Sequence, residues 1–314
     1  MKSNYLIALP VLAVVFISGC TNGGPTGGPG VIISGFTPEI SPVHSEEQVS
    51  LLLQVQNQGE SRARNVQAEL TNIDPNEWGV GFQRTVQLGD LIARDQVSNT
   101  QGETKQVQFQ NLRAPILSKG ISFGYEPIVR VTYDYSTSAH KPITIVDRDE
   151  LIRIQQQGQT LPSQQTTYTA GPLAVEITMG NYVPSVSSFG SGRAFDIFPV
   201  NVKITNTLWE EGGRPTSRGL FGSQFNYPVR VRIDPPAGTN FVFSGFGDDC
   251  SSSQFTVDLF RGKEIEITCE LQVTNAPSIR TEDLLKVDLD YSFYTDKSTK
   301  LTVQGTRELG TGFF

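Results

Sequence analysis

Three cysteines are the residues of this 314-residue chain whose type and spacing most clearly suggest chemistry. Cys250 and Cys269 lie nineteen positions apart in the C-terminal half, whereas Cys20 follows an apolar N-terminal run. In an exported chain, the C-terminal pair predicts a disulfide. Closing a loop of that size contributes about 3 kcal/mol of stability in the chain-entropy model. A pair of buried free thiols is the alternative interpretation.

Clustered carboxylates are the second group that could do chemistry. Asp147, Asp149 and Glu150 lie close together near the end of the first half of the chain. Oxygen ligands of this kind hold Ca²⁺ between tandem β domains, so the cluster is a candidate calcium site. A solvated charge cluster at the end of a strand is the alternative. The chain has no EF-hand loop and no glycine-aspartate repeat, and no other cofactor is expected.

The composition argues against catalysis and against a nucleic-acid partner. The chain contains only two histidines, His44 and His140, both in polar, turn-like surroundings that predict exposed loops. Neither belongs to a G-x-S-x-G or H-E-x-x-H motif. The 25 basic and 32 acidic residues give a net charge of −7, which disfavours binding to phosphates. We therefore expect a protein that is not an enzyme and does not bind nucleic acid.

Aromatic side chains in long Gly/Ser-containing loops are the expected partner surface, because loops at the end of a sandwich commonly carry recognition. The alternative is that these rings fold back over the core. The candidate residues are Trp209, Phe221, Phe225, Phe243 and Phe246.

The N-terminal residues predict export. Lys2 precedes an apolar run over residues 5–17, which is short for a membrane-spanning helix and typical of a secretory signal. Residues 17–20 (Ile-Ser-Gly-Cys) resemble a lipobox, and this resemblance implies cleavage before Cys20 and lipid attachment to it. The Gly/Pro-rich residues that follow predict a flexible tether. An ordinary signal peptide or a short N-terminal anchor is the alternative. We expect a protein anchored to the membrane and facing its extracytoplasmic side.

Short alternating strands separated by turns predict an all-β fold from Val31 onward. The pattern occurs twice: residues 131–135 (VTYDY) match residues 287–291 (VDLDY), and strands in the two halves end at Asn57 and Asn206. This predicts two tandem immunoglobulin-like β-sandwiches. The expected organisation is a signal peptide at 1–19, a lipid-attachment site and tether at 20–30, sandwiches at 31–155 and 171–308, a linker at 156–170 and a tail at 309–314.

Residues 51–70 (LLLQVQNQGESRARNVQAEL) resemble the opening strand pair of CARDB-like and related Ig-like domains of archaeal and bacterial surface proteins. In the second half only part of the pattern persists. The resemblance implies a non-enzymatic adhesion or spacer module. The alternative is a subunit of a surface filament or envelope complex that assembles by β-strand pairing. The matching residues are Val55, Asn57, Gly59, Ala63, Asn65 and Val66, then Val202, Ile204 and Asn206.

Overall fold

β-Strands make up nearly all of the regular structure. The computed structural model describes residues 28–306 except 80–83, 163, 181–182, 186–196, 218–225, 243–249, 251, 253 and 276. Within these residues there are nineteen strands and one helix, so the prediction of an all-β, sandwich-type fold is confirmed. The signal peptide, Cys20, most of the tether and the tail at 309–314 lie outside the described residues.

The central sheet has the order β16-β14-β18-β8-β4-β5. The short strands β9 and β11 also pair with β8, and β13 pairs with β18. The bounds of these strands are β4 (Ala63–Thr71), β5 (Thr85–Leu91), β8 (Ile128–Asp147), β9 (Thr167–Tyr168), β11 (Val183–Ser185), β13 (Arg214–Thr216), β14 (Pro228–Asp234), β16 (Phe255–Asp258) and β18 (Arg280–Ser298).

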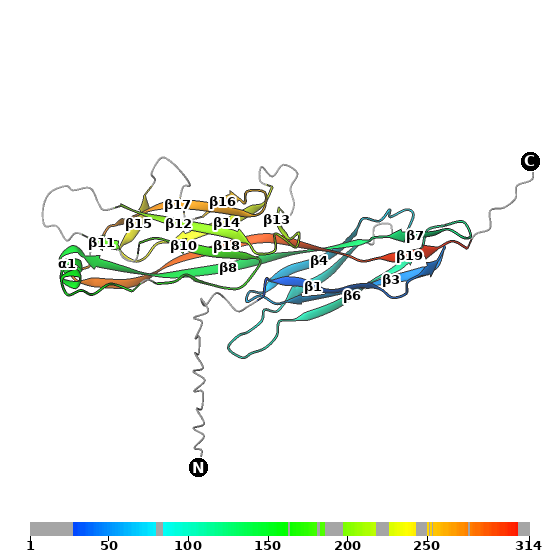
Figure 1. Ribbon diagram of the computed structural model, residues 1–314, viewed down its shortest axis with the longest axis horizontal. Helices are drawn as coiled ribbons and strands as arrows, with labels where there is room; N and C mark the ends of the chain where they lie inside the picture. Colours follow the sequence, from blue (N-terminus) through cyan, green and yellow to red (C-terminus); the bar gives the residue numbers. More distant parts are fainter. Residues whose placement is uncertain are drawn as a thin grey trace, which may run out of the picture.

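Two further sheets cover the central sheet, one in each half of the molecule, and a small sheet forms one tip (Figure 1). The first cover sheet contains β1 (Val31–Pro38), β3 (Gln48–Asn57) and β6 (Thr104–Arg113). The second contains β10 (Leu173–Thr178), β12 (Ile197–Asn206), β17 (Glu264–Val273) and β15 (Thr239–Val242). The tip sheet contains β2 (Val43–His44), β19 (Leu301–Gln304) and β7 (Ser122–Tyr125). The helix is α1 (Arg148–Gln156).

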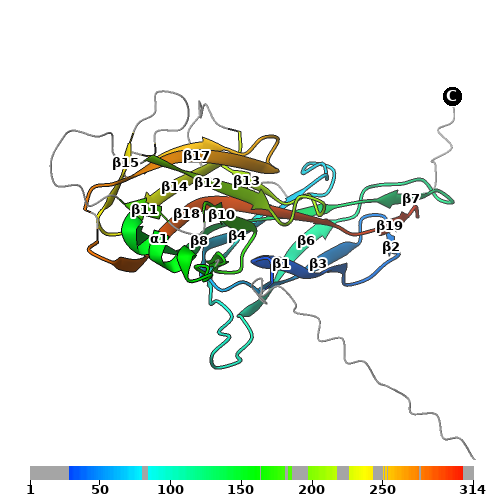
Figure 2. The ribbon, with the colours of Figure 1, turned by 60° about the vertical axis from the view of Figure 1, so that its left-hand side comes forward.

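Two long strands, β8 and β18, run through both halves of the molecule. They contain 20 and 19 residues and pair antiparallel along their length, from Arg280↔Val146 to Ser298↔Ile128. At about 3.3 Å per residue, β8 alone spans roughly 66 Å. Figures 1 and 2 show the pair along the axis of the elongated molecule. Within β8 and β18 alternate side chains are buried over most of the length, so the two sandwiches share one continuous core face.

This sharing of strands differs from the expected organisation along the chain. The end of β18, together with β19, returns to the first half, where β19 pairs with β2 and β7. The expected boundary of the first sandwich at residue 155 falls inside α1, and the expected linker contributes β9 to the central sheet. The apolar segments at 128–135 and 142–146 belong to one strand, because Thr137 and Ala139 continue the buried alternation between them.

The two halves are related by a local pseudo-two-fold axis. The motifs that match in sequence lie directly opposite one another, with Tyr135 paired to Tyr291 and Tyr133 paired to Phe293. Outward from this pair, β4 and β5 flank β8 as β14 and β16 flank β18. The cover strands β1-β3-β6 likewise correspond to β10-β12-β17. We call the level of the Tyr135–Tyr291 pair the waist of the molecule.

Aromatic side chains fill the core at the waist. The rings of Tyr133, Tyr135, Tyr291 and Phe293 contact one another with centroids 6.0–6.3 Å apart. The hydroxyls of Tyr291 and Thr137 are hydrogen-bonded at 2.8 Å. Burial raises the pKa of Tyr291 well above its usual value, so this phenol stays neutral. The core at the waist is therefore a packed, uncharged junction between the two halves.

The repeated asparagines also have the same role in both halves. Asn57 is fully buried, and its amide donates to the carbonyls of Ser61 at 2.8 Å and Leu91 at 3.2 Å. Its Oδ1 accepts from the backbone N–H of Gly59 at 3.1 Å. Asn206 makes the same three kinds of bond, with two carbonyls and with the amide two residues later. Each asparagine thus satisfies the backbone where a core strand turns out of its sheet.

Candidate functional site

The cysteine pair forms the predicted disulfide. Cys250 and Cys269 are joined, with their Cα atoms 5.7 Å apart. Both residues are buried, and Cys269 lies on β17 opposite Val200 of β12. The bridge therefore fastens the loop before β16 to the second cover sheet.

The predicted calcium ligands have other partners in the structure. Asp147 is the N-cap of α1, and its carboxylate accepts from the backbone N–H of Asp149 at 3.0 Å. Glu150 forms two hydrogen bonds with Arg153, each at 2.7 Å. Within the described ranges, no group of three or more His, Cys, Asp or Glu side chains is arranged to hold a metal ion.

Of the predicted partner-binding aromatics, the structure describes Trp209 alone. Its ring is half-buried beneath the guanidinium of Arg214, whose Cζ lies 3.6 Å from the ring centroid. Arg214 also donates to the carbonyl of Trp209 at 2.9 Å. One face of this ring is therefore already occupied by a cation–π contact. Phe221, Phe225, Phe243 and Phe246 lie outside the described residues.

The expectation for the histidines is wrong in one case. His140 is half-buried within β8, opposite Lys286 of β18, rather than in an exposed loop. The Ser-rich residues before it resemble a turn in sequence but continue the strand. His44 is exposed on the short strand β2.

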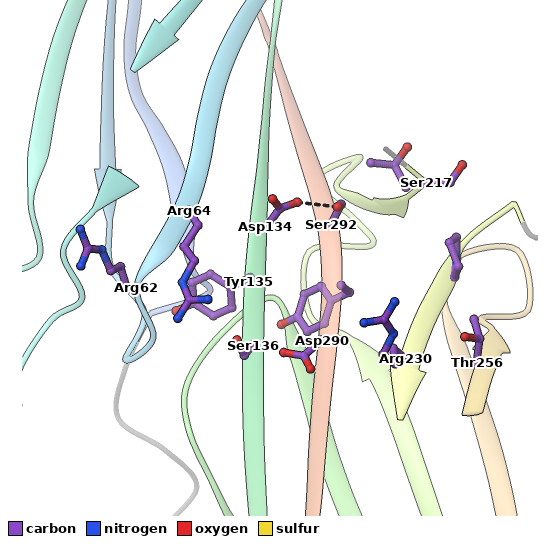
Figure 3. A pocket seen from close by; sticks show the side chains of 13 residues that line it. Arg62, Arg64, Asp134, Tyr135, Ser136, Ser217, Arg230, Thr256, Asp290 and Ser292 are labelled. Carbon is purple, nitrogen blue, oxygen red and sulfur yellow. Dashed lines mark hydrogen bonds between the residues drawn. The ribbon is translucent and has the colours of Figure 1, made fainter. Parts of the chain in front are cut away.

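The structure reveals a different candidate site, a shallow groove of about 380 Å³ on the outer face of the central sheet at the waist (Figure 3). Side chains alternate across a sheet, so this face carries the neighbours of the buried tyrosines. Its charged, serine and threonine lining residues are Arg62, Arg64, Asp134, Ser136, Thr216, Ser217, Arg230, Thr256, Asp290 and Ser292.

Two cross-strand rows form the floor of the groove. In the first row, Arg64 of β4 is opposite Asp134 of β8, which is opposite Ser292 of β18. In the second row, Arg230 of β14 is opposite Asp290 of β18, which in turn is opposite Ser136 of β8. The pseudo-two-fold axis exchanges the rows, so each half of the chain contributes the same three residue types. Figure 3 shows the two arginines on opposite sides of the long strands.

Hydrogen bonds in the groove leave its two arginines available. The carboxylate of Asp134 accepts from Ser292 Oγ at 2.5 Å and from Asn65 Nδ2 at 2.8 Å. Arg62 is paired with Asp90 at 3.1 Å. By contrast, Arg64 and Arg230 are exposed and form no ion pair or side-chain hydrogen bond among the residues that the structure describes. Two guanidinium groups therefore face solvent in an otherwise hydrogen-bonded surface.

A charged ladder continues along the same face beyond the groove. Asp288 accepts from Ser138 Oγ at 2.6 Å and is paired with Lys286 at 3.2 Å and with Arg232. Partial burial raises the pKa of Asp288, but the hydrogen bonds from these three partners lower it further, and the net shift is downward. This carboxylate is therefore ionised and fully engaged, unlike the two groove arginines.

Only part of this groove was visible in the sequence. The alternation in residues 131–135 correctly places Tyr on the inner face and Thr or Asp on the outer face. The missing information was the pairing of β8 with β18, which brings Asp134 and Asp290 into neighbouring rows. Nothing local in sequence marks Arg64 or Arg230 as different from other surface arginines.

Comparisons with known proteins do not assign the chain to a family. No protein-family model matches it, and no curated protein sequence matches it. In the described ranges, no helix is both long enough and apolar enough to cross a membrane. Function is therefore inferred from the residues and their geometry.

Proposed function

We propose that this protein is a lipid-anchored, extracytoplasmic module with a non-enzymatic binding or structural role. The observation that carries the proposal is the Cys250–Cys269 disulfide. Structural disulfides persist in oxidising compartments outside the cytosol. The resemblance of residues 17–20 to a lipobox then supplies the means of attachment, through Cys20.

The point where the N-terminal segment joins the fold gives the module an orientation. The backbone N–H of Gly28 donates to the carbonyl of Gln58 at 3.0 Å, and Gln58 N–H donates to Gly30 at 2.7 Å. A Cβ built on Gly30 would meet the ring of Pro172 at 2.7 Å, so this segment is packed between the two cover sheets at the waist. The chain thus enters the elongated fold near its middle.

A short tether that joins the fold at its middle limits how far an elongated, membrane-anchored molecule (a rod) can stand from the membrane. Eight positions separate Cys20 from Gly28, and even a fully extended segment of that length spans at most about 29 Å. This distance is less than half the roughly 66 Å of β8. A lipid on Cys20 would therefore hold the rod close to the membrane by its waist. This geometry favours a binding platform over a spacer that projects from the surface.

Metabolic labelling with a radioactive fatty acid tests the anchor. The wild-type protein should incorporate label and fractionate with membranes, whereas Cys20→Ser should lose the label and leave the membrane fraction. Thr21→Ala is the matched control, because it changes the adjacent residue and keeps the thiol. Membrane retention of an unlabelled Cys20→Ser protein would refute the lipid anchor.

The alternative, assembly by strand pairing, is favoured by one observation at the tip. In the described structure β7 is an edge strand of the tip sheet, and the side chains of Ile121, just before it, and of Phe123, within it, are 52% and 54% exposed. An apolar edge strand is a template for pairing with a second copy. Sedimentation velocity across a concentration series tests this. Self-association that Phe123→Lys abolishes would support assembly, and a monomer at every concentration would exclude it.

A further inference from the structure

We propose that the groove at the waist binds an acidic oligosaccharide, with Arg64 and Arg230 holding two anionic groups of the same chain. The groove lies where the two halves meet, because each of its rows combines an arginine and an aspartate of one half with a serine of the other. The proposal does not rest on the lipid anchor, which determines only the direction in which the groove faces.

The two arginines define the charge of the ligand. Both guanidiniums are exposed in the groove, and neither has an acidic partner within the described part of the chain. A guanidinium binds a carboxylate or sulfate through two parallel N–H···O bonds, which are stronger than neutral hydrogen bonds. The ligand therefore carries anionic groups that reach these two side chains.

The distance between the arginines defines the length of the ligand. Arg64 on β4 and Arg230 on β14 are separated by the two long strands and lie in adjacent rows. With strands about 4.8 Å apart and rows about 6.7 Å apart, their Cα atoms are about 16 Å apart in a flat sheet. A small anion cannot bridge this distance. An extended ligand with repeated anionic groups can contact both arginines at once.

The side chains in the middle of the groove indicate which groups the ligand carries between its anionic groups. Between the arginines lie the carboxylates of Asp134 and Asp290 and the hydroxyls of Ser136 and Ser292. Carboxylates accept hydrogen bonds from hydroxyl groups and repel further negative charge. The backbone of DNA has no free hydroxyl between its phosphates to donate to these carboxylates, which disfavours it as the ligand. An acidic sugar chain carries hydroxyl donors between its anionic groups.

The strand arrangement also disfavours an acidic peptide as the ligand. Peptides commonly bind a sheet by adding a strand to a free edge. Here the row-forming strands β14, β18, β8 and β4 each pair with a neighbour on both sides. The groove therefore presents side chains without free backbone donors or acceptors.

The groove and the described end of the tether, residues 28–30, lie on opposite faces of the central sheet. The segment entering at the waist packs on the inner face, where Tyr135 donates to Ala170 at 3.3 Å. Asp134 and Ser136 flank Tyr135 along β8 and point to the opposite face. If the proposed anchor holds the waist at the membrane, the groove faces outward, where an extracellular polysaccharide can reach it.

Isothermal titration calorimetry with tetragalacturonate tests the proposal on the soluble chain beginning at Thr21. The comparison ligands are its methyl ester, monogalacturonate and a hexaglutamate peptide. The variants are Arg64→Gln and Arg230→Gln. Arg280→Gln, an exposed arginine at the far end of β18, is the matched control. Thermal unfolding of each variant verifies that the fold is intact.

We expect tetragalacturonate to bind, with about tenfold weaker affinity after each single groove substitution and loss of binding in the double variant. Arg280→Gln should leave the affinity unchanged, and the methyl ester and the monomer should bind at least tenfold more weakly. Absence of tetragalacturonate binding would overturn the proposal, as would binding that survives the double substitution. Equal or tighter binding of hexaglutamate would identify an acidic peptide site instead. None of these outcomes depends on lipid at Cys20, so failure of the anchor and failure of the groove are distinguishable.

Discussion

Asn57→Ala tests whether the shared strands make the two halves unfold as one unit. The substitution removes three hydrogen bonds and leaves the N–H of Gly59 and the carbonyls of Ser61 and Leu91 without their side-chain partner. Each buried polar group that loses its partner costs about 1–3 kcal/mol. Since solvent can relax into part of the site, we expect a total loss of about 3–4 kcal/mol. For a chain of this size, that lowers Tm by about 5 °C.

The two tryptophans of the chain provide a separate reporter for each half. Trp78 is fully buried in the first half, and Trp209 is half-buried in the second. Trp209→Phe leaves only the first reporter, and Trp78→Phe leaves only the second. Guanidinium unfolding followed by fluorescence, with and without Asn57→Ala in each single-tryptophan background, measures the effect on both halves.

Because β8 and β18 belong to both sandwiches, Asn57→Ala should shift both reporters by the same amount. Asn206→Ala, the equivalent change in the second half, is the reciprocal control and should also move the Trp78 transition. A Trp209 transition that stays in place while the Trp78 transition moves would show that the halves unfold independently. That result would refute the inference that the shared sheet couples them.

Three other properties can be predicted from the structure. Replacing Cys250 and Cys269 by alanine should lower stability by about 3 kcal/mol, the loop-closure value for this separation; equal stability of bridged and unbridged proteins in denaturant would contradict this. Because the pKa of Asp288 is lowered on folding, its contribution is present above about pH 4 and is lost as the pH falls further. Asp288→Asn should therefore reduce the fall of Tm at acid pH. Parallel Tm-against-pH curves for the wild-type and Asp288→Asn proteins would contradict this prediction. Gly59→Ala should cost on the order of 2–4 kcal/mol, since its Cβ would lie 2.0 Å from the hydroxyl of Tyr135. Gly124→Ala, with no atom within 4 Å, should be nearly neutral in the same assay.

The strands were predictable because their signals are local. Alternation marked the core face of β3, β12, β17 and most of β18, and the two asparagines marked equivalent strand ends. The cysteine pair could likewise be assigned from spacing together with the export signal. In each case the residues that carry the signal are close in sequence or follow a two-residue period.

The pairing of β8 with β18 could not be read in the same way. Both strands have the same buried alternation, so either one could complete a sheet within its own half of the chain. Their register joins residues 128–146 to residues 280–298, and this long-range choice depends on packing of the waist aromatics. The helix α1 was not expected either, although in this case a local signal is present in the sequence. Asp147 followed three residues later by Glu150 is a local capping pattern, but the same carboxylates are also the residues expected to bind calcium.

The groove is a consequence of duplication combined with antiparallel pairing. Two equivalent strands that pair at their equivalent tyrosines must place their outward neighbours around the same two-fold axis. Asp134 and Ser136 of one half therefore meet Ser292 and Asp290 of the other, and the flanking strands add one arginine at each side. A separate half would present one arginine with one aspartate and one serine, enough to hold a single anionic group. The paired halves present two anion-binding positions in a fixed geometry, and the rigid sheet between them selects for ligands long enough to occupy both.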